Sequence, residues 1–371
     1  MIIQNGLALI GKKLVKADVA FDRVITSVGN TLPGTDTFDA AGCYVVPGFV
    51  EIHSHGAVDH DFTDGDAAGL QPMADYYAAH GVTSFLATTM TAPEAVLLQA
   101  VTTIGHHRWQ DGAKCAGIHL EGPFLSTAKK GAQLESALHR PDTAMFHRLN
   151  DASGGMVKLV TVACEEPGGM DFVAQVSGEC TVSLGHTVAD YDTAMEAFQK
   201  GASHVTHLYN GLESLHHRKP GVIAAACDSG ASVELICDGL HVHPAVIRLT
   251  HQLFGEHLNI VSDSLRCAGM PDGLYDLSGQ QIEVRGGRAT LAGTDTLAGS
   301  CISILDEVRN VTGYGIPLAD ALYAASTAPA DAVNLRDRGR IAVGQCADLL
   351  VLDKELRLKA VFIDGKAFPA K

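Results

Sequence analysis

The sequence lacks the features of a disulfide-stapled, zinc-ribbon or membrane-spanning protein. Its 371 residues include 9 cysteines, and the closest two, Cys227 and Cys237, are too far apart to form a Cys-x-x-Cys pair. Zinc-ribbon and thioredoxin-type folds are therefore excluded, and we expect reduced cysteines in a cytoplasmic protein. No apolar run approaches the roughly 20 residues that a membrane helix needs. The first residues also lack the basic and apolar regions of a secretory signal.

Positive charge is scarce as well. Lys and Arg total 27 against 42 Asp and Glu, so the formal net charge is -15. A negative field of this size repels nucleic acid and anionic membranes, and we expect neither as a partner. A small anionic ligand stays compatible with the field if a local basic cluster holds it.

The composition is nevertheless that of a globular protein. The chain is 46% hydrophobic and 19% charged, which excludes disorder, collagen and coiled coil. Its length suits one large α/β barrel with an appendage, or two to three ordinary domains. Histidine is unusually frequent, with 18 residues.

Short apolar runs alternate with helix-like segments through the middle of the chain. The runs are residues 44–52, 82–88, 116–120, 157–163, 181–184, 204–208, 232–236 and 259–261. Eight apolar strands alternating with helices predict an α/β fold of the (β/α)8 TIM-barrel type. A doubly wound open sheet has the same alternation, but the sequence contains neither of the glycine-rich phosphate-binding motifs that often accompany it.

Both ends of the chain have a different pattern. Short alternating or apolar segments separated by Gly, Asn, Pro and Asp predict strands and tight turns there. We expect a small β-sandwich built from both termini, with residues 1–47 and 338–371, around a barrel of residues 48–337.

Polar residues follow six of the eight runs. In a barrel, the carboxyl ends of the strands meet at one mouth, where active residues lie. Four of the histidines there, with one or two of the carboxylates, form a set of ligands that suits Zn, Fe, Mn or Co. His53 and His55 lie two apart, so they share one face of a strand. The strand-end residues are His53, His55, Glu121, His186, His207, Asp238, His241 and Asp263.

Two further features bear on catalysis and binding. Asp263 follows the last strand and so faces the same mouth. We therefore interpret Asp263 as a general acid and base and not as a turn residue. Residues 216–221 form a basic stretch (HHRKPG) after the sixth strand. One interpretation of this stretch is a solvated loop. The other is an anion-binding loop, because the planar guanidinium of Arg218 can donate two hydrogen bonds to a phosphate.

At this point several motifs together resemble a known family. They are residues 46–56 (VPGFVEIHSHG), 119–125 (HLEGPFL), 184–187 (LGHT), 206–211 (THLYNG), 238–242 (DGLHV), 261–263 (VSD), 297–300 (LAGS) and 344–350 (GQCADLL). The chain resembles the amidohydrolase superfamily and, within it, the N-acetylglucosamine-6-phosphate deacetylase family. The resemblance covers essentially the whole chain.

The resemblance implies a function and a set of roles. It implies hydrolysis of the acetamide of a phosphorylated amino sugar, with one or two divalent ions, zinc foremost, in a homodimer. Glu121, His186 and His207 would hold one ion, and His53 and His55 a second that Glu121 bridges. Asp263 would be the general base and acid, and His241 would contact the acetyl carbonyl. The implied substrate contacts are Ala132, Gln133, Asn210, Gly211, Arg218, Asp238, His241, Leu297, Ala298 and Gly299.

Departures from the family pattern leave alternatives open. Gln133 stands where the family usually has a substrate-contacting His, Glu51 where Asp is common, and Gly211 where Ala is more usual. A sister activity on N-acetylgalactosamine 6-phosphate differs by one hydroxyl contact. Cyclic-amide hydrolases and deaminases often use a carbamylated lysine, but Lys158 lies at the wrong end of its strand. A barrel used only as a binding scaffold predicts erosion of the ligand set, which is complete here.

Overall fold

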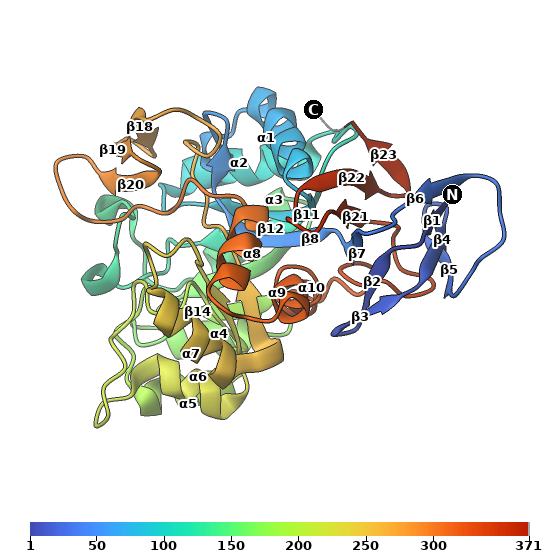
Figure 1. Cartoon of the computed structure of the whole chain (residues 1–371). Helices are drawn as coiled ribbons and strands as arrows, with labels where there is room; N and C mark the ends of the chain where they lie inside the picture. Colours follow the sequence, from blue (N-terminus) through green and yellow to red (C-terminus); the bar gives the residue numbers. More distant parts are fainter. Residues whose placement is uncertain (370–371) are drawn as a thin grey trace.

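A sheet of eight parallel strands forms the centre of the computed structural model, which describes residues 1–369 (Figure 1). The strands pair in chain order, each parallel to the next. They are β8 (Phe49–Ser54), β11 (Val82–Thr89), β12 (Lys114–Glu121), β13 (Val157–Val162), β14 (Thr181–Leu184), β15 (His204–Val205), β16 (Ser232–Leu235) and β17 (Leu258–Ile260). The predicted barrel is confirmed.

The segment after β17 closes the barrel against β8. Ser264 forms a parallel bridge with Ser54, and the carbonyl of Ser264 accepts a hydrogen bond from the backbone N–H of His55 at 2.8 Å. The backbone N–H of Asp263 donates to the carbonyl of His53 at 2.9 Å. Closure thus brings the last strand end beside the histidine pair of the first.

Helices connect the strands and cover the outside of the barrel. Asp190 caps one of them, since its side chain accepts from the backbone N–H of Thr193. Within residues 1–369, no helix combines the length and apolarity needed to cross a membrane. The helices are α1 (Ala67–Ala79), α2 (Glu94–His106), α3 (Thr143–Ala152), α4 (Gly169–Val176), α5 (Tyr191–Gln199), α6 (Gly221–Ser229), α7 (Pro244–Phe254), α8 (Ile304–Gly313), α9 (Leu318–Ala324) and α10 (Thr327–Ala332).

As expected, strands from both ends of the chain form further sheets: one contains N-terminal strands alone, and one combines strands from both ends (Figure 1). One has the order β5 (Ile25–Gly29), β4 (Asp18–Phe21), β1 (Ile2–Gln4) and β6 (Thr37–Asp39). The other has the order β23 (Lys366–Phe368), β22 (Leu358–Ile363), β21 (Leu349–Leu352), β7 (Tyr44–Pro47), β2 (Leu7–Ile10) and β3 (Lys13–Lys16). Ile3, Val19, Val45, Val351 and Phe362 share one buried core that spans both sheets.

The prediction that residues 44–52 form one strand was wrong. The run contains β7, which pairs with β2 and β21, and the start of β8, which pairs with β11. The two strands are separate because the chain leaves the terminal sheet after Pro47 and enters the barrel at Phe49.

A three-stranded antiparallel sheet between β17 and α8 was not predicted. It consists of β18 (Gly273–Leu277), β19 (Gln280–Arg285) and β20 (Arg288–Leu291). Leu277, Ile282 and Val284 share a buried cluster with Ala132 and Ala298. This packing holds the small sheet beside the segments that carry several predicted substrate contacts.

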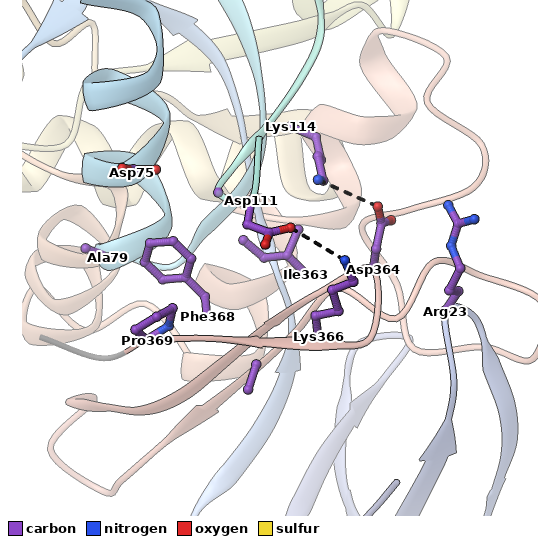
Figure 2. A pocket seen from close by; sticks show the side chains of 12 residues that line it. Arg23, Asp75, Ala79, Asp111, Lys114, Ile363, Asp364, Lys366, Phe368 and Pro369 are labelled. Atoms are coloured by element: carbon purple, nitrogen blue, oxygen red, sulfur yellow. Dashed lines mark ion pairs between the residues drawn. The ribbon is translucent and has the colours of Figure 1, made fainter. Parts of the chain in front are cut away.

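A cavity of about 610 Å³ lies where the terminal sheets meet the barrel (Figure 2). Arg23, Lys114, Asp111, Asp364 and Lys366 line it. Lys114 pairs with Asp364 at 3.8 Å, and Lys366 with Asp111 at 3.6 Å. Its charged groups therefore largely neutralise one another, and its lining includes no strand-end histidine.

The buried carboxyl of Asp348 gives a testable pH dependence of stability. Burial raises the pKa of Asp348 to about 6, above its usual value. The group therefore favours folding most below about pH 4, and this contribution is lost as pH rises through about 6. Asp348→Asn should raise the free energy of unfolding at pH 8 by about 3 kcal/mol and less at pH 5, as measured by urea denaturation.

Asp353 provides the control of opposite sign. Burial opposes the ionised form, but hydrogen bonds from the backbone and side chain of Arg357 hold the pKa of Asp353 at about 2. Asp353→Asn should therefore lower stability at pH 8. A stability gain at pH 8 from Asp353→Asn, or none from Asp348→Asn, would contradict this account.

Candidate metal centre

The five predicted metal ligands lie together at the carboxyl ends of four strands, around the carboxylate of Glu121. Its Oε1 lies 2.9 Å from Nε2 of His207, 3.1 Å from Nε2 of His186 and 3.6 Å from Nε2 of His53. Its Oε2 lies 3.1 Å from Nε2 of His55. All five side chains are buried. Four imidazoles thus direct the same ring nitrogen at one carboxylate.

The distances within this cluster suit divalent ions. The donors form two groups that share Glu121, one with His53 and His55 and one with His186 and His207. The Nε2 atoms lie 3.3 Å apart in the first pair and 3.1 Å apart in the second. Two nitrogens bound tetrahedrally to one zinc ion lie about 3.3 Å apart. Each group therefore has donors of the right kind and separation to hold an ion.

Hydrogen bonds at Nδ1 fix the orientation of three imidazoles. Nδ1 of His186 lies 2.7 Å from the carbonyl oxygen of Lys129, and Nδ1 of His207 lies 3.1 Å from that of Asn210. Nδ1 of His53 instead faces a carboxylate oxygen of Glu234 at 2.7 Å. An Nδ1–H that donates to such an acceptor leaves the lone pair of Nε2 free to bind metal.

The backbone is strained at three of the clustered residues. His186, His207 and Asp263 have φ values of 47°, 25° and 47°. Left-handed backbone at a non-glycine residue costs on the order of 1–3 kcal/mol and persists where the surroundings impose it. At each of these three residues the chain turns sharply where a strand ends, and this turn directs the side chain into the mouth of the barrel.

Opposite charges inside the cluster control its protonation. Burial alone would raise the pKa of Glu121, but the neighbouring histidines hold it well below its usual value. Burial opposes protonation of His55, yet Asp263 and Glu121 raise the pKa of His55 to about 9. The pKa of Asp263 is lowered, because His53 and His55 outweigh its burial. The carboxylates are thus ionised at neutral pH, and protons compete with a metal ion for the imidazoles.

A cavity of about 360 Å³ opens directly above the clustered donors. It is lined by eight of the ten predicted substrate contacts. These eight are Ala132, Gln133, Asn210, Gly211, His241, Leu297, Ala298 and Gly299, and the lining also includes His55, Glu121, His186, His207, Asp263 and Arg288. The structure therefore brings most of the predicted residues to one concave site.

The other two predicted contacts lie outside this lining. The carboxylate of Asp238 faces Nδ1 of His241 at 2.7 Å, so it orients a residue that does line the cavity. Arg218 is exposed and lines a separate cavity with Glu213 and Asp190. Its role in binding phosphate stays a prediction.

The side chain of Gln133 is already engaged by protein groups. Its Nε2 donates to Oε2 of Glu121 at 2.6 Å, and its Oε1 accepts from the backbone N–H of Thr91 at 2.8 Å. Gln133 therefore holds the central carboxylate as well as lining the cavity. The lysine considered for carbamylation, Lys158, lies at the start of β13 and outside the lining.

Glu234 and Arg288 are among the residues at the site that were not predicted. Glu234 is fully buried on β16 and contacts His53, although its strand was predicted only as an apolar run. Arg288 lies on β20, in the sheet that was not predicted. Glu234 could have been found, because a charged residue inside an apolar strand is itself a signal. Nothing in the sequence indicates that the hairpin with Arg288 extends to the cavity.

Comparison with known proteins identifies the family. The sequence model of the amidohydrolase family matches residues 44–368. The chain belongs to the amidohydrolase family. An N-acetylglucosamine-6-phosphate deacetylase from Bacillus subtilis is 35% identical over 344 residues, which cover 89% of this chain and 86% of the relative. An N-acetylgalactosamine-6-phosphate deacetylase from Escherichia coli O157:H7 is 33% identical over 86% of each chain.

Solved amidohydrolase structures resemble the whole chain. An aspartate-to-alanine mutant of N-acetyl-D-glucosamine-6-phosphate deacetylase from Mycobacterium smegmatis, in complex with N-acetyl-D-glucosamine-6-phosphate, is 34% identical with a TM-score of 0.93. The alignment covers 99% of this chain and 98% of that structure. The similarity thus extends through barrel and terminal sheets together.

Proposed function

We propose that this amidohydrolase hydrolyses the acetamide of N-acetyl-D-glucosamine 6-phosphate to D-glucosamine 6-phosphate and acetate. The observation that carries the proposal is the complete donor set around Glu121 beneath a cavity lined by the predicted substrate contacts. The relatives named for this activity, at 35% identity and with nearly full coverage, support the same choice of substrate.

The donor set indicates the kind of chemistry. Glu121, His186 and His207 would hold one divalent ion, and His53, His55 and Glu121 a second. A bound divalent ion supplies a water of lowered pKa and polarises the amide carbonyl. We further propose that the ion is zinc, which imidazole and carboxylate ligands suit, and that the protein is a cytoplasmic homodimer. Elemental analysis and light scattering test the ion and the assembly.

Asp263 would transfer protons, and His241 would stabilise the negative charge that develops on the acetamide oxygen. The lowered pKa of Asp263 keeps it ionised, so it accepts a proton from the attacking water. Asp263 then gives that proton to the departing amine, which is a poor leaving group until protonated. His241, whose Nδ1 faces the carboxylate of Asp238, would contact the oxygen of the acetamide on which negative charge develops.

A second candidate substrate is the 4-epimer, N-acetylgalactosamine 6-phosphate. The relative from Escherichia coli O157:H7 carries that name at 33% identity, close to the values for the glucosamine relatives. The epimers differ in one hydroxyl group, so a single polar contact in the cavity decides between them.

A substrate panel tests the proposal. Metal-analysed protein is assayed for acetate release from N-acetylglucosamine and N-acetylgalactosamine, each with and without 6-phosphate. We expect the highest kcat/KM for N-acetylglucosamine 6-phosphate. Higher kcat/KM for the epimer would favour the second candidate, and no acetate from any member of the panel would refute both.

The two candidate phosphate-binding arginines, Arg218 and Arg288, can be tested separately. A guanidinium that binds phosphate contributes about 1.5–3 kcal/mol, so its loss should raise KM by about 10–150-fold. We expect this for Arg218→Ala, as the basic stretch predicts, and the same assay applied to Arg288→Ala tests the arginine that lines the cavity. KM for the substrate without phosphate should not change. An unchanged KM for the phosphorylated sugar removes that arginine as a clamp.

A further inference from the structure

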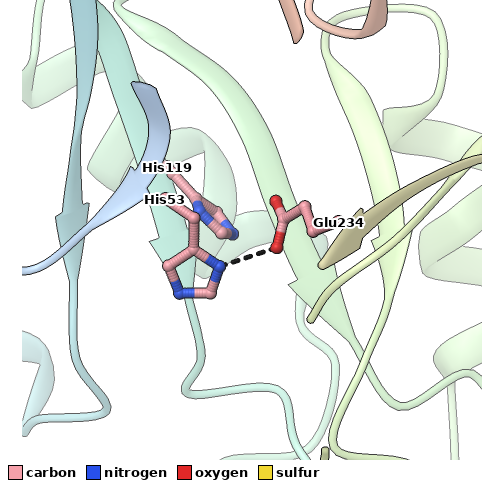
Figure 3. A group of neighbouring side chains, drawn as sticks. All are labelled: His53, His119 and Glu234. Atoms are coloured by element: carbon pink, nitrogen blue, oxygen red, sulfur yellow. Dashed lines mark hydrogen bonds and ion pairs between the residues drawn. The ribbon is translucent and has the colours of Figure 1, made fainter. Parts of the chain in front are cut away.

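A carboxylate lies beneath the metal donors, outside the cavity. Glu234 is on β16 and has no solvent exposure. Figure 3 shows it facing His53, with His119 beside them, and donor atoms of the three residues lie within 4.8 Å of one another. Burying a carboxylate in a barrel core is unfavourable unless partners compensate for the lost hydration. Its contacts therefore indicate what it does.

One oxygen of Glu234 contacts both groups of donors. Oε2 accepts from Nδ1 of His53 at 2.7 Å and from the backbone N–H of His207 at 3.0 Å. His53 belongs to one predicted ion site and His207 to the other. Oε1 has no hydrogen-bond partner within residues 1–369, and Nε2 of His204 lies 3.9 Å from it. The strong contacts of the carboxylate thus all go to the donor cluster.

The contact with His53 determines which of its nitrogens can bind metal. With Nδ1 protonated and donating to Glu234, Nε2 carries the lone pair. That Nε2 faces Nε2 of His55 at 3.3 Å, Asp263 at 3.5 Å and Glu121 at 3.6 Å. The lone pair therefore points to the centre of the first donor group.

His53 differs in this respect from the other three imidazoles. His186 and His207 have backbone carbonyls at Nδ1, and Nδ1 of His55 is without a hydrogen-bond partner in the part of the chain that is described. Of the four, His53 alone has a carboxylate there. A carboxylate behind a ligand histidine raises its basicity as well as fixing its orientation.

We propose that Glu234 is a positioning residue for the metal centre, which it serves by orienting His53 toward the first ion and by anchoring the backbone of His207 at the second. The inference rests on the proposed function, because it takes His53 and His207 as metal ligands. It assigns Glu234 no contact with substrate.

Metal affinity measured directly tests the proposal. Metal-free wild type, Glu234→Ala and Glu234→Gln are titrated with Zn²⁺ against a chromophoric chelator. Loss of a carboxylate behind a ligand typically weakens binding 10–100-fold. We expect this for Glu234→Ala at one ion at least. Glu234→Gln should weaken binding measurably but by less than about tenfold, because its amide oxygen still accepts from Nδ1 of His53 but carries no negative charge.

A second buried carboxylate provides the matched control. Glu307, on α8, is equally buried, and its Oε1 accepts from the backbone N–H of Cys237 at 3.0 Å. Glu307→Gln should leave zinc affinity unaltered. A purely structural role for Glu234 predicts the same behaviour for its own variants, so unchanged zinc affinity in Glu234→Ala and Glu234→Gln would overturn the proposal. If the alanine variant does not fold, the glutamine variant decides, and zinc affinity equal to wild type would again overturn it.

A ligand variant separates this inference from the proposed function. His55→Ala should remove one zinc ion from the wild-type count. If the ion count and affinity stay unchanged in His55→Ala, the first donor group binds no ion, and that part of the proposed function fails together with the inference. If His55→Ala loses an ion but both Glu234 variants bind zinc as wild type does, only the inference fails.

Discussion

Asp263→Asn is expected to lower kcat by about 10²–10⁴-fold while the protein keeps its bound metal. The carboxylate lines the cavity and lies 3.3 Å from Nε2 of His55, where an attacking water would release its proton. Asparagine cannot accept that proton, but it keeps the shape of the side chain. It also tolerates left-handed backbone, so the φ of 47° at this position is not a further obstacle.

The measurements are acetate release under saturating substrate and elemental analysis of the same sample. Asp320→Asn is a suitable control, because this carboxylate pairs with Lys12 and His251 on the surface and should leave kcat unchanged. Near-normal turnover in Asp263→Asn would refute Asp263 as the base. Loss of metal from the variant would instead make Asp263 a ligand, and the fall in kcat would then say nothing about proton transfer.

Much of the architecture could be predicted because it depends on periodic patterns. All eight barrel strands overlap predicted apolar runs, and the terminal sheet that combines both ends followed from strand-like segments there. The break within residues 44–52 was missed because strands of the sandwich and of the barrel are equally apolar there. Only Pro47 and Gly48 mark the point where the chain changes sheet.

The donor set could be predicted for a different reason. Parallel strands in a barrel end at the same mouth, so residues distant in sequence are brought together by topology alone. On this basis His53, His186 and His207 each place Nε2 within 3.6 Å of Oε1 of Glu121. No side-chain detail was needed for that step.

Residues inside strands and on loops were harder to predict. Glu234 alternates with Val233 and Leu235, which pack in the main core, so the strand period alone puts Glu234 on the inner face. The sequence contained this signal, and it was overlooked. Arg218 and Arg288 are different, because the reach of a loop or hairpin over the mouth depends on packing such as that of Ile282 and Val284 against Ala132.

Glu121→Gln is expected to abolish activity by removing metal from both groups of donors. Both contain Glu121, and its two oxygens face the Nε2 atoms of His186, His207 and His55 at 2.9–3.1 Å. The amide has one oxygen in place of two and no negative charge, so it cannot bridge two ions. Zinc affinity should fall by more than about 100-fold, the upper end of what the loss of an indirect contact costs.

Thermal unfolding with and without zinc checks this independently of turnover. An ion that binds only the folded protein stabilises it by about 4 kcal/mol when present at 1,000 times its Kd, so wild-type Tm should rise on zinc addition. The Tm of Glu121→Gln should not respond over the same range, whereas Glu135→Gln, at an exposed carboxylate near Lys130, should behave as wild type. A normal zinc-dependent rise in Glu121→Gln would mean that the ions are held without the carboxylate at the centre of the cluster, and the two-group arrangement would be wrong.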